Sequence, residues 1–169
     1  MWIIVCDIPQ RNYRKLSIMS LIGKLVSELE INVAAEKYYR VFKEKAFHVP
    51  TISPGIFQQV EVHDGDWDDH GHGSVKTWKY TLDGKDEVFK EQVEFDDEKY
   101  AMTMIGLEGD VFTHYKTFKG TYHVVPKGPE HSLAVMSLEY EKLDDGSPYP
   151  YSYLDIMNRV TKDIESHLK

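Results

Sequence analysis

The sequence predicts an α+β fold in which one antiparallel sheet carries helices on one side. Six strand-like segments follow one another between residues 56 and 143, each separated from the next by a turn signal. A further strand-like segment and two short helical segments precede them, and a long amphipathic helical segment ends the chain. Consecutive strands joined by tight turns favour antiparallel pairing, with the helices segregated to one side of the sheet.

The first strand is predicted at residues 21–32, where side chains alternate in character. Alternation with a period of two is typical of a strand with one buried and one solvated face. Lys24, Glu28 and Glu30 share one face, and the other face holds Leu25, Ser27, Leu29 and Ile31.

The next segment is predicted to be helical. Tyr38, Tyr39 and Phe42 recur at helical spacing, which indicates a helix over residues 34–45. Pro50 and Pro54 restrict any continuation to a short second helix, because proline disrupts the interior of a helix.

Six strands are expected after these helices. The strongest turn signal is Asp83-Gly84, a pair typical of two-residue hairpins. In the strand before it, Lys76, Trp78 and Tyr80 share one face. The predicted strands cover 56–62, 73–82, 87–95, 99–109, 113–125 and 133–143.

A long helix is predicted over residues 151–168. Pro148 and Pro150 suit its entry, since proline is tolerated at the start of a helix. Its apolar stripe is made of Leu154, Met157, Val160, Thr161, Ile164 and Leu168.

The composition of the 169 residues narrows the possible functions. A net charge of −8 disfavours binding to nucleic acid or to an anionic membrane, which both need a basic face. No apolar run is long enough to span a membrane. The single cysteine, Cys6, excludes an intramolecular disulfide and fits a cytoplasmic location. We expect residues 1–18 to be a poorly packed extension of one domain over residues 19–169, either a monomer or at most a weak dimer.

The stretch from His63 to Trp78, HDGDWDDHGHGSVKTW, is the most conspicuous candidate for a metal or phosphate site. A calcium loop starting at Asp64 would need glycine at its sixth position and glutamate at its twelfth, but Asp69 and Val75 stand there. For zinc, His70 and His72 lie two apart with no cysteine nearby, and phosphate would be repelled by the aspartates. We therefore expect a solvated loop without metal or cofactor, in which Trp67 only packs.

Four segments resemble the major latex protein group of the plant Bet v 1 type superfamily, which includes the class 10 pathogenesis-related proteins. They read LIGKLVSELEINVAAEKYYRVFK, GDWDDHGHGSVKTWKYTLDGK, GLEGDVFTHYKTFKGTYHVVPKG and LEYEKLDDGSPYPYSYLDIMNRVTKDIESHL. The resemblance runs from about Leu21 to Lys169. It implies a START-like helix-grip fold, in which a seven-stranded antiparallel sheet wraps a long C-terminal helix around an apolar cavity that takes small hydrophobic ligands.

The candidate ligand-binding residues are those expected on the concave face of the sheet and on the helices opposite. Composition alone favours a filled core at these positions, whereas the resemblance favours a cavity wall. Methionine suits a pocket that adapts to several ligands, and aromatic residues with a polar tip can orient a ligand. The set is Phe42, Trp78, Tyr80, Met102, Met104, Phe118, Tyr122 and Met157.

Three functions follow from the resemblance and the residues. The favoured one is binding or carriage of a small hydrophobic plant metabolite or hormone-like molecule, associated with defence or stress. A second is a regulatory protein whose loops around Trp67 and Gly109-Asp110 contact a partner. The third is an acid–base enzyme of specialised metabolism, such as alkaloid synthesis, but no complete catalytic set can be mapped. The scattered acid–base candidates are His48, His114, His123, Glu108, Tyr122, Tyr140 and Glu139.

Overall fold

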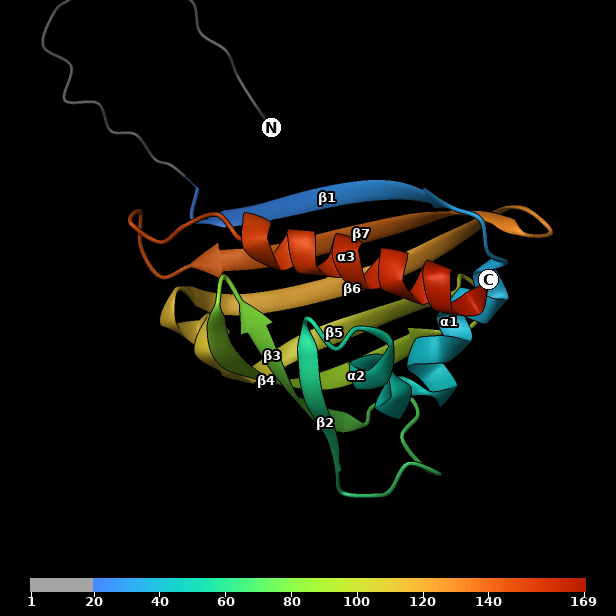
Figure 1. The fold of residues 1–169 in the computed structure, drawn as a ribbon. Coiled ribbons are helices and arrows are strands. Elements are labelled where there is room, and N and C mark those ends of the chain that lie inside the picture. Colours follow the sequence, from blue (N-terminus) through green and yellow to red (C-terminus); the bar gives the residue numbers. More distant parts are fainter. Residues whose placement is uncertain (1–19) are drawn as a thin grey trace, which may run out of the picture.

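A computed structural model describes residues 20–169, which form a seven-stranded antiparallel sheet and three α-helices (Figure 1). The strand order is β1-β7-β6-β5-β4-β3-β2, so β1 and β2 are the two edges. The predicted α+β helix-grip fold is confirmed. The strands are β1 (Ile22–Ile31), β2 (Phe57–His63), β3 (Val75–Leu82), β4 (Lys85–Asp96), β5 (Ala101–Gly109), β6 (Tyr115–Gly128) and β7 (His131–Lys142). The helices are α1 (Ala35–Glu44), α2 (Val49–Ile52) and α3 (Tyr151–Leu168), with short 3-10 turns η1 (Ala46–His48) and η2 (Asp110–Thr113).

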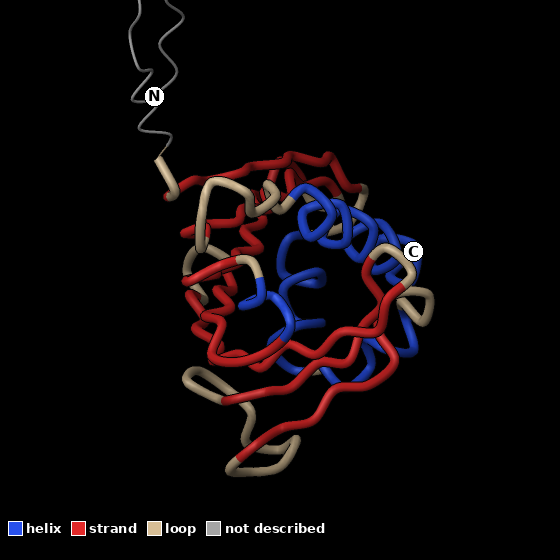
Figure 2. The backbone as a smooth tube through the Cα atoms, turned by 90° about the vertical axis from the view of Figure 1, so that its left-hand side faces the viewer, coloured by secondary structure: helices blue, strands red, loops and turns tan. Residues whose placement is uncertain are grey.

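The sheet curves around α3 and leaves the helices on its concave side. In Figure 2 the strands run around the outside, and the helices close the remaining part of the circle. One polar contact that crosses the interior is the hydrogen bond of 2.8 Å from Ser27 Oγ on β1 to Asn158 Oδ1 on α3. It confirms that Ser27 lies on the inward face of β1, as the alternation predicted.

The turn at Asp83-Gly84 fixes the register of β3 against β4. Both residues have positive φ angles, 50° and 78°, as a type I′ hairpin turn requires. Leu82 therefore pairs with Lys85, and counting back along the two strands places other residue pairs directly opposite each other. The rest of β3 and β4 pairs without interruption as Val75–Gln92, Lys76–Glu91, Thr77–Lys90, Trp78–Phe89, Lys79–Val88, Tyr80–Glu87 and Thr81–Asp86.

Helix α3 buries the predicted stripe against the sheet. Val160 and Ile164 are fully buried, while Leu154 and Leu168 at its two ends are partly buried. Two buried residues were missing from the predicted stripe: Ile156, and the charged Glu165. None of the helices within residues 20–169 is long and apolar enough to cross a membrane.

The loop between β2 and β3 is only partly the solvated turn that was expected. Its four aspartates are exposed, but His70 is buried at 5% exposure. The reason is Trp67, whose ring lies 5.2 Å from that of His70 and 5.5 Å from that of Phe47. Within the described residues, no group of three or more His, Cys, Asp or Glu side chains could hold a metal ion. The expected extension over residues 1–18 lies outside the part of the chain that the structure describes.

Candidate ligand-binding site

The eight predicted ligand-binding residues lie between the sheet and the helices. All eight belong to, or pack against, the same hydrophobic core cluster. Seven of them are buried, and Met104 is partly buried. The structure therefore brings the predicted set together on the inward side of β3, β5, β6, α1 and α3. Whether they line a ligand site or fill a core stays a prediction.

Aromatic side chains from α1 and β6 form one end of this interior. The rings of Phe42 and Tyr122 stack with centroids 4.7 Å apart, and Tyr38 lies edge-on to Phe42 at 5.7 Å. The hydroxyl groups of Tyr38 and Thr161 share a hydrogen bond of 2.8 Å. Burial raises the pKa of Tyr38 and of Tyr122 well above the usual value. Both tyrosines therefore remain protonated at neutral pH and can donate hydrogen bonds.

Flexible methionine side chains meet over a glycine near the middle of the interior. A Cβ atom added at Gly120 on β6 would lie 2.7 Å from Cε of Met104 and 3.7 Å from Cε of Met157. The missing side chain therefore leaves space that two methionine methyl groups occupy. Because methionine is unbranched and has three rotatable side-chain bonds, these two side chains can change conformation at low cost.

A buried polar group lies beside these apolar residues, and the site prediction missed it. Trp78 Nε1 donates a hydrogen bond of 2.8 Å to Glu91 Oε1. Directly opposite Glu91 is Lys76, whose Nζ donates to the carbonyl oxygen of His70 at 3.1 Å and to Ser74 Oγ at 2.7 Å. Glu91 and Lys76 are each 1% exposed.

The surroundings of Glu91 and Lys76 shift the pKa of both side chains. Burial raises the pKa of Glu91 to about 7, against the opposing effects of the Trp78 hydrogen bond and the Lys76 charge. Burial also lowers the pKa of Lys76, and the Glu91 charge opposes that change. Glu91 can therefore gain or lose a proton near neutral pH.

Two tyrosines share a carboxylate at the other end of the interior. Glu87 Oε2 accepts hydrogen bonds of 2.8 Å from Tyr80 on β3 and from Tyr153 on α3. The ring of Tyr153 also lies 5.1 Å from that of Phe118. These contacts join the start of α3 to β3, β4 and β6. The predicted residues Tyr80 and Phe118 therefore lie next to a polar group, which Glu87 and Tyr153 form.

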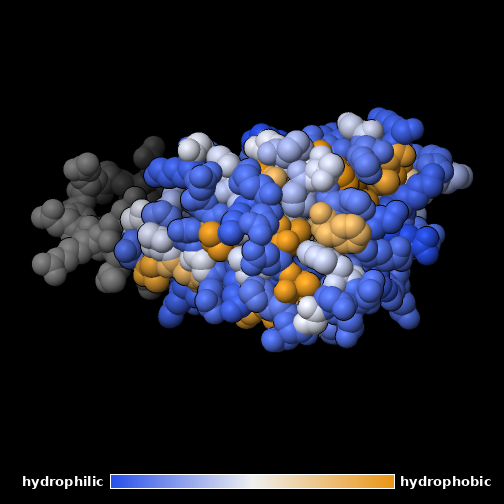
Figure 3. Space-filling view, turned by 60° about the horizontal axis from the view of Figure 1, so that its bottom comes forward, coloured by the Kyte–Doolittle hydropathy of each residue, from blue (hydrophilic) through white to orange (hydrophobic). Residues whose placement is uncertain are grey.

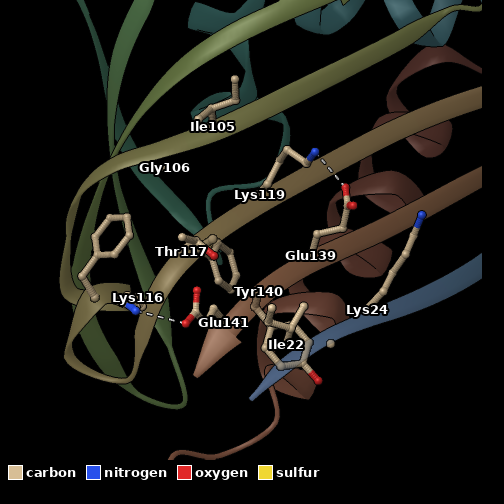
Figure 4. A pocket seen from close by; sticks show the side chains of 13 residues that line it. Ile22, Lys24, Ile105, Gly106, Lys116, Thr117, Lys119, Glu139, Tyr140 and Glu141 are labelled. Carbon is tan, nitrogen blue, oxygen red and sulfur yellow. Dashed lines mark hydrogen bonds and ion pairs between the residues drawn. The ribbon is translucent and has the colours of Figure 1, made fainter. Parts of the chain in front are cut away.

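A separate depression of about 750 Å³ opens on the molecular surface (Figure 4). It lies where β5 and β6 are no longer paired, beyond the pair Ile105–Lys119. Figure 4 shows Lys119 pointing to Glu139, an ion pair of 3.0 Å, and Lys116 pointing to Glu141 at 3.2 Å. Among the predicted ligand-binding residues, only Phe118 lines it. The depression is thus a charged surface groove that shares Phe118 and Tyr140 with the buried core.

The surface seen in Figure 3 is mostly hydrophilic, with hydrophobic groups in small separate patches. The large aromatic side chains of the predicted set are instead buried, as Trp78 is at 6% exposure and Tyr122 at 4%. The predicted ligand-binding residues therefore do not contribute to the hydrophobic patches on this face.

The scattered acid–base candidates do not come together. Glu139 pairs with Lys119 in the surface depression, and Glu108 pairs with Lys90 at 3.1 Å. His114 lines a pocket of about 210 Å³ at the start of α3, and His48 lines a groove of about 220 Å³ between α1 and the end of α3. Tyr122 is itself one of the predicted ligand-binding residues, and Tyr140 on β7 lies directly opposite another of them, Phe118.

The comparisons with known proteins agree with this architecture. Residues 20–169 match the model of the pathogenesis-related protein Bet v 1 family. The chain is 40% identical to MLP-like protein 43 of Arabidopsis thaliana, over 88% of this chain and 94% of that protein. It is 37% identical to major latex protein 146 of Papaver somniferum, over 89% of this chain and 94% of that protein. The crystal structure of major latex-like protein 151 from Panax ginseng superposes with a TM-score of 0.81 at 35% identity, over 88% of this chain and 99% of that one.

Proposed function

Because the chain belongs to the pathogenesis-related Bet v 1 family, we propose that it binds a small apolar molecule between its sheet and α3. The observation that carries the proposal is the meeting of Met104 and Met157 over Gly120. Flexible side chains beside a residue without a side chain make a region that can open for a guest. Stacked Phe42 and Tyr122 at one end supply apolar area together with a hydroxyl group. The proposed lining is the predicted set: Phe42, Trp78, Tyr80, Met102, Met104, Phe118, Tyr122 and Met157.

The biological setting is also part of the proposal. A role in defence or stress rests on family membership, and a cytoplasmic location on the single cysteine of the chain. Cell fractionation and measurement of protein level after infection would test these two points independently of ligand binding. A partner-dependent regulatory role also remains a prediction. It would use the loops around Trp67, which lies against Phe47, and around Asp110, whose carboxylate accepts a hydrogen bond of 2.7 Å from the amide of Val88.

A titration with Nile red tests the proposal. Nile red is an uncharged dye whose fluorescence rises in apolar surroundings. The blocking variant is Gly120→Leu, whose added side chain would displace Met104 and occupy the interior. The matched control is Gly55→Leu, since Gly55 is exposed and has open space around it. We expect saturable binding by the wild type and the control, and at least about tenfold weaker binding by the blocking variant. Equal binding by all three proteins, or no saturable binding by the wild type, would contradict the proposal.

Acid–base catalysis is the second candidate, and one specific observation favours it. Burial raises the pKa of Glu91 to about 7, and a carboxyl group that titrates in this range accepts and donates protons efficiently at neutral pH. A test is hydrogen–deuterium exchange next to the carbonyl group of 1-tetralone in heavy water. If Glu91 catalyses proton transfer, the protein accelerates this exchange and Glu91→Gln does not. An exchange rate equal to that in buffer would exclude this reaction for the ketone tested.

A further inference from the structure

One oxygen of Glu91 is a hydrogen-bonding site that the described part of the protein does not use. Oε1 accepts the indole hydrogen bond of Trp78, but Oε2 is buried and has no hydrogen-bond partner within residues 20–169. Most buried polar atoms in proteins have a partner, because removing such an atom from water without replacing its hydrogen bond costs free energy. A bound molecule with a suitably placed donor would recover that cost.

The position of Glu91 places this oxygen at the proposed ligand site. Glu91 lies on the inward face of β4, next to Trp78 and opposite Lys76 on β3. It is also close enough to the hydroxyl of Tyr122 for its charge to raise the pKa of that tyrosine. The free oxygen is therefore among residues already proposed to line the interior.

The local charges select among the possible donors. A ligand carboxylate would bring a second negative charge next to Glu91 in a region shielded from water, which is unfavourable. A ligand ammonium group would bring a second positive charge next to Lys76, which already lies opposite Glu91. A hydroxyl group adds no net charge and can donate to Oε2. An uncharged hydroxyl donor therefore fits the pair best.

We propose that Glu91 Oε2 accepts a hydrogen bond from the hydroxyl group of an uncharged, otherwise apolar ligand. This inference rests on the proposed function and specifies its ligand class. Trp78 fixes the carboxyl group through Oε1, and the aromatic and methionine side chains hold the apolar body. Fatty acids and other apolar carboxylates are disfavoured by the same arrangement.

Three probes of one ring system test this inference: naphthalene, 2-naphthol and 2-naphthoate. Their dissociation constants are measured by competition with Nile red at pH 7. We expect the wild type to bind 2-naphthol about tenfold more tightly than naphthalene, and 2-naphthoate most weakly. In Glu91→Leu the ratio of naphthol to naphthalene affinity should fall to about one. Glu94→Leu, an exposed change on the outward face of the same strand, should keep the wild-type ratio.

The outcomes separate this inference from the proposed function. Equal affinity for naphthol and naphthalene in the wild type, or a naphthol advantage that persists in Glu91→Leu, would overturn the role of Glu91 but leave apolar binding intact. If none of the probes binds, both proposals are wrong. A second readout needs no variant: the indole N–H resonance of Trp78 should shift more with 2-naphthol than with naphthalene, and equal shifts would count against the inference.

Discussion

Lys76 and Glu91 lie directly opposite each other on β3 and β4, and both side chains are almost completely buried on the α3 side of the sheet. Burying two charged groups costs free energy that their attraction only partly recovers, so such a pair is a poor source of stability. The proposed ligand binding gives the pair a role, because the pair supplies a buried polar group next to the apolar residues of the predicted site.

Replacing Glu91 should change how stability depends on pH. The pKa of Glu91 is about 7 in the folded protein and near its ordinary value when unfolded. A raised folded pKa contributes stability at low pH, and this contribution is lost as the pH rises through about 7. Urea unfolding at pH 5 and pH 8 measures this effect. The free energy of unfolding of Glu91→Gln minus that of the wild type should be more positive at pH 8 than at pH 5, by on the order of 1–3 kcal/mol. Comparison with the wild type at each pH cancels the contributions of histidines. A difference that does not change with pH would contradict the burial of an ionisable Glu91.

Replacing Lys76 should raise the pKa of Glu91 further. The positive charge of Lys76 lowers that pKa, so Lys76→Met removes a stabiliser of the carboxylate. The indole N–H resonance of Trp78 reports the titration, because Trp78 donates to Glu91. We expect a higher midpoint in Lys76→Met and an unchanged one in Lys79→Met, an exposed change on the same strand. A lower or unchanged midpoint in Lys76→Met would show that the two charges do not interact.

Glu165 should stabilise the contact between α3 and the end of β1. Its Oε1 accepts a hydrogen bond of 2.8 Å from the backbone N–H of Asn32, and Lys162 and Lys169 pair with the carboxylate at 3.0 and 3.2 Å. Burial opposes its ionisation, but the Asn32 hydrogen bond and the two lysines outweigh this effect and lower its pKa to about 2. At pH 7 we expect Glu165→Gln to reduce the free energy of unfolding by about 1–3 kcal/mol.

The pH dependence of Glu165 has the opposite sign to that of Glu91. A lowered folded pKa contributes stability above the unfolded value near 4.5, and this contribution is lost as the pH falls toward about 2. The difference between the wild type and Glu165→Gln should therefore shrink on acidification through that range. Asp155→Asn provides the control, because Asp155 is 66% exposed and its pair with Arg159 spans 4.0 Å. If Glu165→Gln costs no more than the control, the carboxylate does not hold this contact.

The strands, helices and inward faces could be predicted because each has a local signal. Alternation in β1, the helical spacing of Tyr38 and Phe42, and the Asp83-Gly84 turn are all properties of neighbouring residues. The same turn also determines the pairing of Lys76 with Glu91, since a two-residue hairpin after Leu82 places these two residues opposite each other. The alternation already put Lys76 on the face of Trp78 and Tyr80, but lysine and glutamate are rarely fully buried, so residue type gave no reason to add either to the predicted site.

Other features of the structure could not be predicted, because they depend on contacts between residues that are distant in the sequence. The burial of His70 depends on Trp67 packing against Phe47, which belongs to a different element some twenty residues earlier in the chain. The choice between a filled core and a ligand site also has no signal in composition, because Met104 and Tyr122 are suited to either. The meeting of Met104 and Met157 over Gly120, on which the proposed ligand site rests, likewise depends on neighbours from β5 and α3 that are distant in the sequence.

The proposed position of the apolar ligand is between the sheet and α3 and not in the surface depression. The most direct test is a methyl NMR titration of the wild-type protein with 2-naphthol. We predict saturable shifts of the methyl resonances of Met102, Met104 and Met157, with little change at Ile22 and Ile105, which line the surface depression. Saturable shifts of the Ile22 and Ile105 resonances with unchanged methionine resonances would show instead that the ligand binds in the surface depression.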